Sequence, residues 1–278
     1  MGTTRVGDLT FPESAKWADA FPRFNEWSAQ WLLDQPIGRD IPPVVYYTMG
    51  ELPAGNAPGN EWRTAPSWPP PSRPLAMYLT VGGALQSDIV ADGGQRTFTY
   101  DPHNPVPTHG GPNLLIPAGS FDQRDTEQRD DVLVFTSDLL ANPLEVTGRL
   151  RAILHVTTTA VDTDFTAKLT DVYPDGRSML LVDGICRLSL RESLEHRSEV
   201  TPGETYRLAV DLWSTSYVFN QGHRICLAIS SSNSPRFEPN PNTGEISGSE
   251  KEAVTATQTL LVGGEHPSHL LLPVIDSR

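Results

Sequence analysis

The feature that most constrains this chain is an alternation of apolar and polar residues that recurs in many short segments. Residues 144–159 read LEVTGRLRAILHVTTT, and the apolar side chains that share one face are Leu144, Val146, Leu150, Ala152, Leu154 and Val156. Successive side chains of a strand point to opposite faces, so this period of two predicts a long β-strand that is buried on one face. With 25 prolines and 22 glycines available for turns and loops, the pattern favours an all-β protein with long loops.

The same alternation predicts further strands along most of the chain. The sequence YPDG at 173–176 predicts a turn between two of them, because proline favours the second position of a β-turn and glycine the fourth. Together they give about nine or ten strands in roughly 200 residues, which is typical of a jelly-roll sandwich of two sheets. The other expected strands are 42–50, 75–81, 132–136, 165–172, 179–192, 205–213, 223–230, 254–262 and 268–275.

The first 40 residues have a different pattern. Residues 17–34 place apolar side chains at helical spacing, which predicts an amphipathic helix. Its aromatic-rich face holds Phe21, Phe24, Trp27 or Ser28, Trp31 and Leu32. Such a face needs a partner, so we expect the helix either to dock on the β domain or to belong with a larger partner. The proline-rich segment 65–74, APSWPPPSRP, is stiff and predicts a linker. We therefore divide the chain into residues 1–73 and residues 74–278.

Charge and cysteine content exclude some functions. The net charge of −13 leaves no basic face for nucleic acid or for an anionic membrane. The sequence contains no run of about 18 apolar residues, so it predicts no membrane-spanning helix. The first residues, MGTTRVGDLTF, lack the apolar core of a signal peptide, so we expect a cytoplasmic protein. Cys186 and Cys226 fall in expected strands; two buried thiols are the simpler interpretation, and one disulfide stays open.

A complete serine hydrolase triad is not expected within this chain. Such enzymes carry the nucleophile on a tight turn between a strand and a helix, with flanking glycines. The serine run Ser230–Ser232 and the serine of SGSE, Ser249, lack that arrangement. His223 is the nearest candidate base to the serine run, but it begins a predicted strand.

A metal site is the second candidate for chemistry. Asp162 and Asp164 in VDTDF offer oxygen ligands of the kind that Ca²⁺ prefers. The alternative is that these aspartates cap turns or pair with arginines. The histidines do not share a ligand spacing with a cysteine or carboxylate, so we expect no transition metal and no cofactor.

The long loop after residue 229 admits two interpretations. Its sequence SSSNSPRFEPNPNTGE, residues 230–245, combines hydroxyl and amide side chains with prolines. These groups can bond loop backbone that has no strand partner, which predicts a rigid scaffold. The other interpretation is a direct ligand role for Ser232, Asn233 or Asn242.

Taken in order, the motifs of this chain closely resemble the C-terminal part of the cocaine-esterase and X-prolyl dipeptidyl-peptidase family of acyl hydrolases. Each motif is weak alone, but the ordered set covers nearly the whole chain. The matching motifs are WSAQWLLD (27–34), FTYDPHNPVPTHGG (98–111), FDQR (121–124), RDDVLVFTSDLL (129–140), LEVTG (144–148), AVDTDFTAKLTDVYPDGR (160–177), GHRI (222–225), SSSNSPRFEPNPNTGE (230–245) and EHPSHLLLPVI (265–275).

The resemblance implies an α/β-hydrolase domain followed by a jelly-roll (galactose-binding-like) domain that closes one side of the active-site cleft. Residues 1–73 then look like the helical and strand remnant of the hydrolase domain, and residues 74–278 look like the jelly roll. No triad residue has a matching position here, so the resemblance implies a chain that is inactive alone and whose partner is the hydrolase domain. The full enzyme would act on a small acyl ester or peptide, and homo-oligomerisation stays open.

One segment is expected to reach the substrate. The sequence GGPNLLIP, residues 110–117, matches a loop that supplies apolar wall to the acyl pocket in relatives. Leu115 and Ile116 are therefore the candidate wall residues, with ordinary sandwich core as the alternative.

Two other functions remain as alternatives. Jelly rolls commonly bind carbohydrate through exposed aromatic side chains, and Trp213 with Tyr217 is the one reasonable pair for that role. The chain is alternatively a stand-alone partner-binding regulator that completes a separately encoded hydrolase domain.

Overall fold

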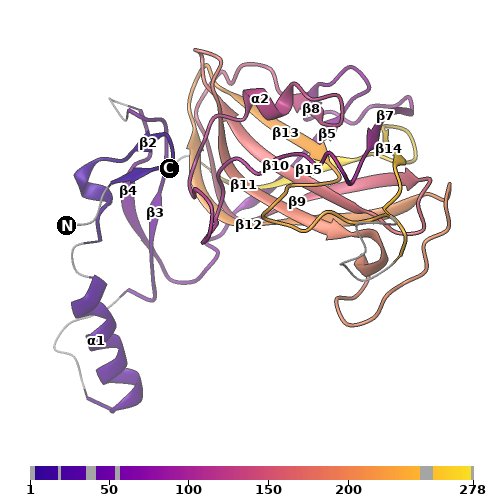
Figure 1. Cartoon of the computed structure of the whole chain (residues 1–278). Coiled ribbons are helices and arrows are strands. Elements are labelled where there is room, and N and C mark those ends of the chain that lie inside the picture. The colour runs from indigo at the N-terminus through magenta and orange to yellow at the C-terminus, as the bar shows by residue number, and fades with distance from the viewer. Residues whose placement is uncertain (1–3, 18–19, 36–41, 54–56, 245–252, 277–278) are drawn as a thin grey trace.

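Most of the chain forms a sandwich of two antiparallel sheets, as the computed structural model shows for residues 4–17, 20–35, 42–53, 57–244 and 253–276 (Figure 1). The smaller sheet has the order β11 (Ser178–Arg187), β10 (Asp164–Val172), β13 (Arg224–Ser230) and β8 (Leu133–Thr136). The larger sheet has the order β6 (Leu85–Gln86), β5 (Arg73–Leu79), β15 (His269–Ile275), β9 (Leu144–Thr158), β14 (Ala256–Val262) and β7 (Gly94–Tyr100), and β12 (Tyr206–Phe219) also pairs with β9. The predicted all-β sandwich is confirmed.

The core lies between the sheets and follows the alternation in the sequence. On β9, every second side chain from Val146 to Val156 is buried, with Gly148 taking one of these places. Large aromatic side chains fill the same layer, among them Phe135, Phe165 and Phe219. Burial of apolar area at about 25 cal/mol per Å² is the main stabilising contribution of such a layer.

Most predicted strands are present with shifted ends, and two longer ones were missed. The strand expected at 254–262 begins at Ala256, and the one expected at 75–81 is Arg73–Leu79. β7 was missed because it buries only Phe98 and Tyr100 of its seven residues, so its alternation is short. The turn predicted at 173–176 is confirmed: the Gly176 amide donates to the Tyr173 carbonyl at 2.9 Å, and it joins β10 to β11.

The N-terminal part contains small elements beside one end of the sandwich (Figure 1). These are β1 (Arg5–Val6), β2 (Leu9–Thr10), a 3₁₀ turn η1 (Glu13–Ala15), α1 (Ala20–Leu32), and the pair β3 (Val44–Thr48) and β4 (Glu61–Ala65). Sequence reasoning missed β4, which pairs with β3. Met49 then bonds to β12 through both backbone groups, at 2.9 Å to Ser216 and 2.9 Å to Val218. The domain boundary predicted after residue 73 stays a prediction.

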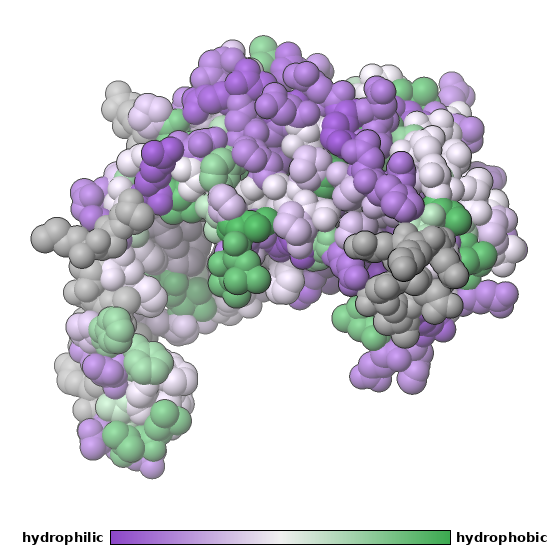
Figure 2. Space-filling model, viewed as in Figure 1, coloured by the Kyte–Doolittle hydropathy of each residue, from purple (hydrophilic) through white to green (hydrophobic). Residues whose placement is uncertain are grey.

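The aromatic face of α1 is exposed rather than docked. Phe21 is 82% exposed, Phe24 65% and Trp31 65%. In Figure 1 the helix stands away from the sandwich, and in Figure 2 apolar residues colour its surface. Of the two alternatives for the helix, docking on the β domain is therefore wrong. The observed helix is shorter than 17–34, and residues 18–19 of that range lie outside the described residues.

Both cysteines are free thiols, and the disulfide alternative is wrong. Cys226 lies on β13 and Cys186 on β11, and these two strands pair with opposite edges of β10. The two strands are therefore roughly 10 Å apart, which exceeds the span of a disulfide. Burial raises the pKa of Cys226 to about 12 and that of Cys186 to about 11. None of the helices in the described ranges is long and apolar enough to cross a membrane.

Candidate functional site

An apolar pocket of about 710 Å³ lies where the N-terminal strands meet the sandwich. Its walls come from β1 and β2, the segment at Met49, the loop 110–119, β11 and β12, and they include Val6, Phe11, Met49, Pro112, Leu181 and Trp213. A second hollow of about 1020 Å³ lies between β4 and the proline-rich segment 66–73, and its walls mix proline with the ion pair of Arg63 and Glu145. The apolar pocket is the candidate because it adjoins the loop that the sequence singled out.

The loop 110–119 is closed at its base by backbone bonds. The Gly111 and Gly119 amides each donate to the other residue's carbonyl, at 2.8 and 3.0 Å, and the Asn113 side chain donates to the Gly110 carbonyl at 2.7 Å. Gly119 has φ +120°, and a Cβ on it would lie 2.4 Å from the Gly7 nitrogen. Only glycine fits where the N-terminal strand crosses this base so closely.

The tip of this loop is apolar and exposed. Leu114 is 100% exposed and Leu115 99%, whereas Ile116 is partly buried. The alternative that placed Leu115 in the sandwich core is therefore wrong. A closed loop that holds leucines in water is typical of a surface with a further binding partner. The role of Leu115 and Ile116 as wall of an acyl pocket stays a prediction.

Trp213 lies at the edge of the same pocket in an unusual backbone conformation. It sits in an irregularity of β12 with φ +65°, and its side chain is 63% exposed. Its amide donates to the Asp211 carboxylate at 3.1 Å, which holds that conformation. Tyr217 is only 2% exposed and donates to Asp171 at 2.7 Å. The aromatic pair proposed for carbohydrate binding is therefore not an exposed pair.

The serine run is buried, and two of its three hydroxyls bond to the protein. Ser230 shares a hydrogen bond of 2.6 Å with Thr166, and the Ser232 hydroxyl accepts the Val106 amide at 2.8 Å. His223 is also buried, and its Nδ1 lies 2.9 Å from the Asp171 carboxylate. Among the described residues, no serine hydroxyl bonds to His223. The pair of His223 and Asp171 therefore has a structural role, because no serine nucleophile among the described residues is bonded to it.

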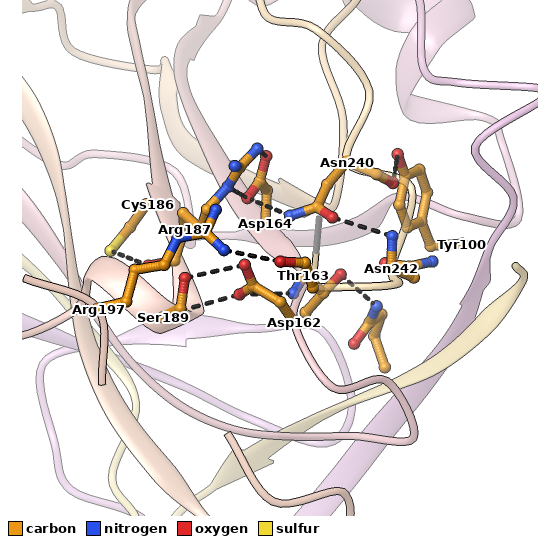
Figure 3. A network of polar contacts seen from close by, with 12 residues as sticks. Tyr100, Asp162, Thr163, Asp164, Cys186, Arg187, Ser189, Arg197, Asn240 and Asn242 are labelled. Carbon is orange, nitrogen blue, oxygen red and sulfur yellow. Dashed lines mark hydrogen bonds and ion pairs between the residues drawn. The ribbon is translucent and has the colours of Figure 1, made fainter. Parts of the chain in front are cut away.

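Asp164 anchors the long loop 230–244, and the nearby Asp162 caps a turn (Figure 3). Asp164 accepts from the Asn240 side chain at 2.8 Å and pairs with Arg187 at 2.9 Å. Asp162 accepts from the Ser189 amide and hydroxyl at 3.0 and 2.8 Å. These are the turn-capping and arginine-pairing roles given as the alternative to a calcium site. In the described part of the chain, no three His, Cys, Asp or Glu side chains are placed to hold a metal ion.

The residues proposed for a direct ligand role in this loop are buried. Ser232 is 2% exposed, and Asn233 and Asn242 are each 1% exposed. The Asn233 side chain donates to Asp183 at 2.9 Å, and the Asn242 side chain donates to the Val254 carbonyl at 2.6 Å. The scaffold interpretation of the loop is therefore the one that the structure supports.

A buried polar floor connects the two loops, and sequence reasoning missed it. Lys168 on β10 faces Asp183 on β11 and donates to Gln123 at 3.3 Å. Gln123 in turn donates to the His109 carbonyl at 2.7 Å, next to the loop 110–119. Burial lowers the pKa of Lys168 to about 8, although the charge of Asp183 acts against that shift. Lysine in an otherwise apolar strand pattern is the signal that could have revealed this floor.

Comparisons with known proteins agree on one family. The sequence profile described as the X-Pro dipeptidyl-peptidase C-terminal non-catalytic domain matches residues 39–271. The cocaine esterase of Rhodococcus sp. is 42% identical over 249 residues, which are 84% of this chain and 42% of that protein.

Solved structures agree with this match. An aminopeptidase from a marine sediment Thaumarchaeota archaeon superposes with a TM-score of 0.83 and 27% identity, covering 98% of this chain and 46% of that one. An α-amino acid ester hydrolase superposes with a TM-score of 0.75 and 27% identity, covering 91% of this chain and 44% of that one. The chain thus spans less than half the length of each of these relatives.

Proposed function

Because this chain belongs to the family of X-Pro dipeptidyl-peptidase C-terminal non-catalytic domains, we propose that it supports an α/β-hydrolase domain and forms one wall of its acyl pocket. The hydrolase domain supplies the serine nucleophile, its base and the acyl-enzyme chemistry on a small ester or peptide. The partner is either an upstream segment of the same protein or a separate chain. The described residues of this chain contribute surface and no catalytic group.

The observation that carries the proposal is the exposed leucine tip beside an apolar pocket. A fully exposed Leu115 on a closed loop has no role in the fold of this chain. The N-terminal segment runs along the same pocket, since the Asp8 amide donates to the Ser120 carbonyl at 2.8 Å. A hydrolase domain that precedes this segment is therefore tethered next to the loop.

The helix α1 supports the same proposal from a second side. Its exposed apolar residues have the spacing of a helix packed against a sheet or other helices. Packing against the hydrolase domain would bury that face. The apolar face, the pocket and the tip of loop 110–119 together form a surface for one large apolar partner, which we call the docking surface.

The first test separates a support domain from an enzyme. The purified chain is treated with a fluorophosphonate and analysed by intact mass, while turnover of p-nitrophenyl butyrate is followed. We expect no adduct and no turnover. A stoichiometric adduct with turnover would overturn the proposal, and peptide mapping would begin at Ser230–Ser232.

The second test places the loop tip in a working enzyme. A chimera joins the catalytic part of the Rhodococcus cocaine esterase to this chain in place of its own C-terminal domain. In that chimera we expect Leu115→Ala or Ile116→Ala to change kcat/KM more for esters with large acyl groups than for acetates. Leu194→Ala is the matched control, because Leu194 is 88% exposed but lies on a different loop, between β11 and β12. Equal effects on all acyl groups would remove the wall role.

The remaining parts of the proposal concern location and assembly. A cytoplasmic location agrees with the two free thiols, and cell fractionation tests it. Self-association through the exposed face of α1 is tested by sedimentation with and without the hydrolase domain. Loss of self-association when that domain is added is the expected result.

A further inference from the structure

A histidine is buried between two carboxylates at the junction of the N-terminal part and the sandwich. His223 is 1% exposed, and its Nδ1 lies 2.9 Å from Asp171 on β10. Its other ring nitrogen, Nε2, lies 3.6 Å from the carboxylate of Glu51. Glu51 follows β3 and belongs to the N-terminal part, so the ring lies between the two parts of the chain.

The groups around the ring come from every element packed against it. Tyr217 on β12 donates to Asp171 at 2.7 Å, and the Tyr173 ring packs on the imidazole at 4.6 Å between centroids. Arg177 lies over the Tyr173 ring, 4.7 Å from its centroid. The neighbouring Arg224 points away and donates to the Ser137 carbonyl at 2.8 Å. The charged groups that face the ring are therefore the two carboxylates.

The segment Met49–Leu52 is held by this cluster on one side and by β12 on the other. The Leu52 amide donates to the Tyr173 hydroxyl at 3.1 Å, and the Asn220 side chain donates to the Glu51 carboxylate. The Met49 carbonyl accepts the Val218 amide at 2.9 Å. Met49 and Gly50 are also part of the wall of the apolar pocket. The same few residues thus connect the cluster to the docking surface.

The protonation state of the ring decides what it can do for Glu51. Neutral His223 with its proton on Nδ1 donates to Asp171, and its Nε2 then presents a lone pair to the Glu51 carboxylate. Protonated His223 donates from both nitrogens. Among the described residues, Nε2 has no hydrogen-bond partner, and it is buried, so Glu51 is the acceptor within its reach.

We propose that His223 is a pH-dependent latch, which in its protonated form bridges Asp171 and Glu51 and holds the segment Met49–Leu52 against the sandwich. Loss of the proton on Nε2 removes the attraction to Glu51 and loosens that segment, and with it one wall of the apolar pocket. The proposal concerns this chain alone and does not rest on the hydrolase partner.

The direction of the pH dependence follows from the surroundings of the ring. Burial lowers the pKa of His223, but the bond and charge of Asp171 and the charge of Glu51 outweigh burial, so its pKa is raised above the usual value. A raised histidine pKa stabilises the folded state fully below about pH 6.5, the unfolded value, and this stabilisation is lost as pH rises through the folded value. The latch is therefore closed in mild acid and opens on the alkaline side.

The test uses histidine titration and hydrogen exchange on the full chain. Nuclear magnetic resonance of ¹⁵N-labelled histidine follows His223 in the wild type and in Glu51→Gln. We expect Glu51→Gln to lower the pKa of His223. Exchange of the Leu52 and Val218 amides, corrected for the intrinsic effect of pH, should quicken several-fold as pH rises through that pKa in the wild type. In Glu51→Gln the corrected rates should change little with pH.

Glu61→Gln is the matched control, since Glu61 lies on the same hairpin and its side chain is 58% exposed beside Arg63. It should leave both the His223 titration and the exchange profile unchanged. Two outcomes would overturn the latch. One is a His223 pKa that does not respond to Glu51→Gln, and the other is corrected exchange of Leu52 that is independent of pH in the wild type.

Discussion

Two loops of this molecule have similar composition, but one is largely buried in the fold and the other holds its tip in solvent. Loop 110–119 and loop 230–244 both combine proline, glycine and asparagine. The longer one is anchored by Asp164 and Asp183, and its asparagines, Asn233, Asn240 and Asn242, are buried and bonded within the chain. The shorter one closes on itself and holds Leu114 and Leu115 in water. Similar turn chemistry thus produces a scaffold in one place and a presented surface in the other.

The difference comes from where each loop finds its hydrogen-bond partners. Loop 230–244 has side-chain partners on neighbouring strands, since Asp164 accepts from the Asn240 side chain and the Tyr100 hydroxyl donates to the Asn240 carbonyl, so the loop is part of the fold. The base of loop 110–119 is satisfied by its own backbone and by the N-terminal segment, so its tip is not needed for folding. Burial of polar side chains indicates structure here, and exposure of apolar ones indicates function.

The largest expected effect comes from removing the anchor of the buried loop. Asp164→Ala leaves Arg187 without its partner and removes an acceptor of Asn240. Breaking a buried ion pair by removing one member costs about 3–5 kcal/mol of the free energy of unfolding. Urea denaturation measures the change.

The control for this variant is Asp175→Ala, whose ion pair with Arg177 is exposed, with 55% of the Asp175 side chain accessible. Its cost should stay below about 1 kcal/mol. If both variants lower the free energy of unfolding by the same amount, Asp164 is not an anchor. The contrast between the two loops would then be wrong.

The second prediction concerns the polar floor on which both loops rest. The folded pKa of Lys168, lowered by burial to about 8, lies below its unfolded value of about 10.4. Folding is therefore opposed at low pH by the charged lysine, and stability should rise as pH increases from about 8 to 10.4. Relative to Lys168→Met, the wild type should gain roughly 3 kcal/mol over that interval, measured by urea denaturation at both ends. If the difference in free energy of unfolding between the two proteins stays constant with pH, Lys168 is solvated in the folded state.

The third prediction concerns the closed base of the exposed loop 110–119. Gly119→Ala places a Cβ 2.4 Å from the Gly7 nitrogen at φ +120°, and such strain costs on the order of 1–3 kcal/mol. The N-terminal segment should separate from the loop, which faster exchange of the Asp8 amide would report. Gly203→Ala shares a positive φ but meets nothing within 4 Å, so it should leave that amide unchanged.

Much of the fold was predictable from the sequence, because alternation and turn chemistry are local signals. The buried face of β9, the turn at 173–176 and the aromatic face of α1 all follow from spacing alone. β4 and β7 were not predictable in this way, since each buries too few side chains to show a period.

The candidate site was predictable only in part, because it is assembled from distant segments. The loop 110–117 was singled out by family resemblance, and its exposed tip agrees with a surface role. The pocket beside it joins residues from 6 to 236, and the latch joins Glu51, Asp171 and His223. No local pattern relates residues so far apart in the chain. Tyr217 illustrates the limit, because its place on β12 did not reveal that its side chain points into the core.

The smallest expected effect on stability is at the loop tip, and a small effect is what a tip with no role in the fold should give. Leu115→Ala removes a side chain that is 99% exposed, so the free energy of unfolding should change by less than about 0.5 kcal/mol. Leu154→Ala, which removes a leucine that is 0% exposed on β9, should cost about 2–5 kcal/mol. Thermal and urea denaturation of both variants measure the contrast. A cost above about 1 kcal/mol for Leu115→Ala would mean that the tip is packed in solution. The loop would then belong with the scaffold, and a surface kept for a partner would no longer explain its leucines.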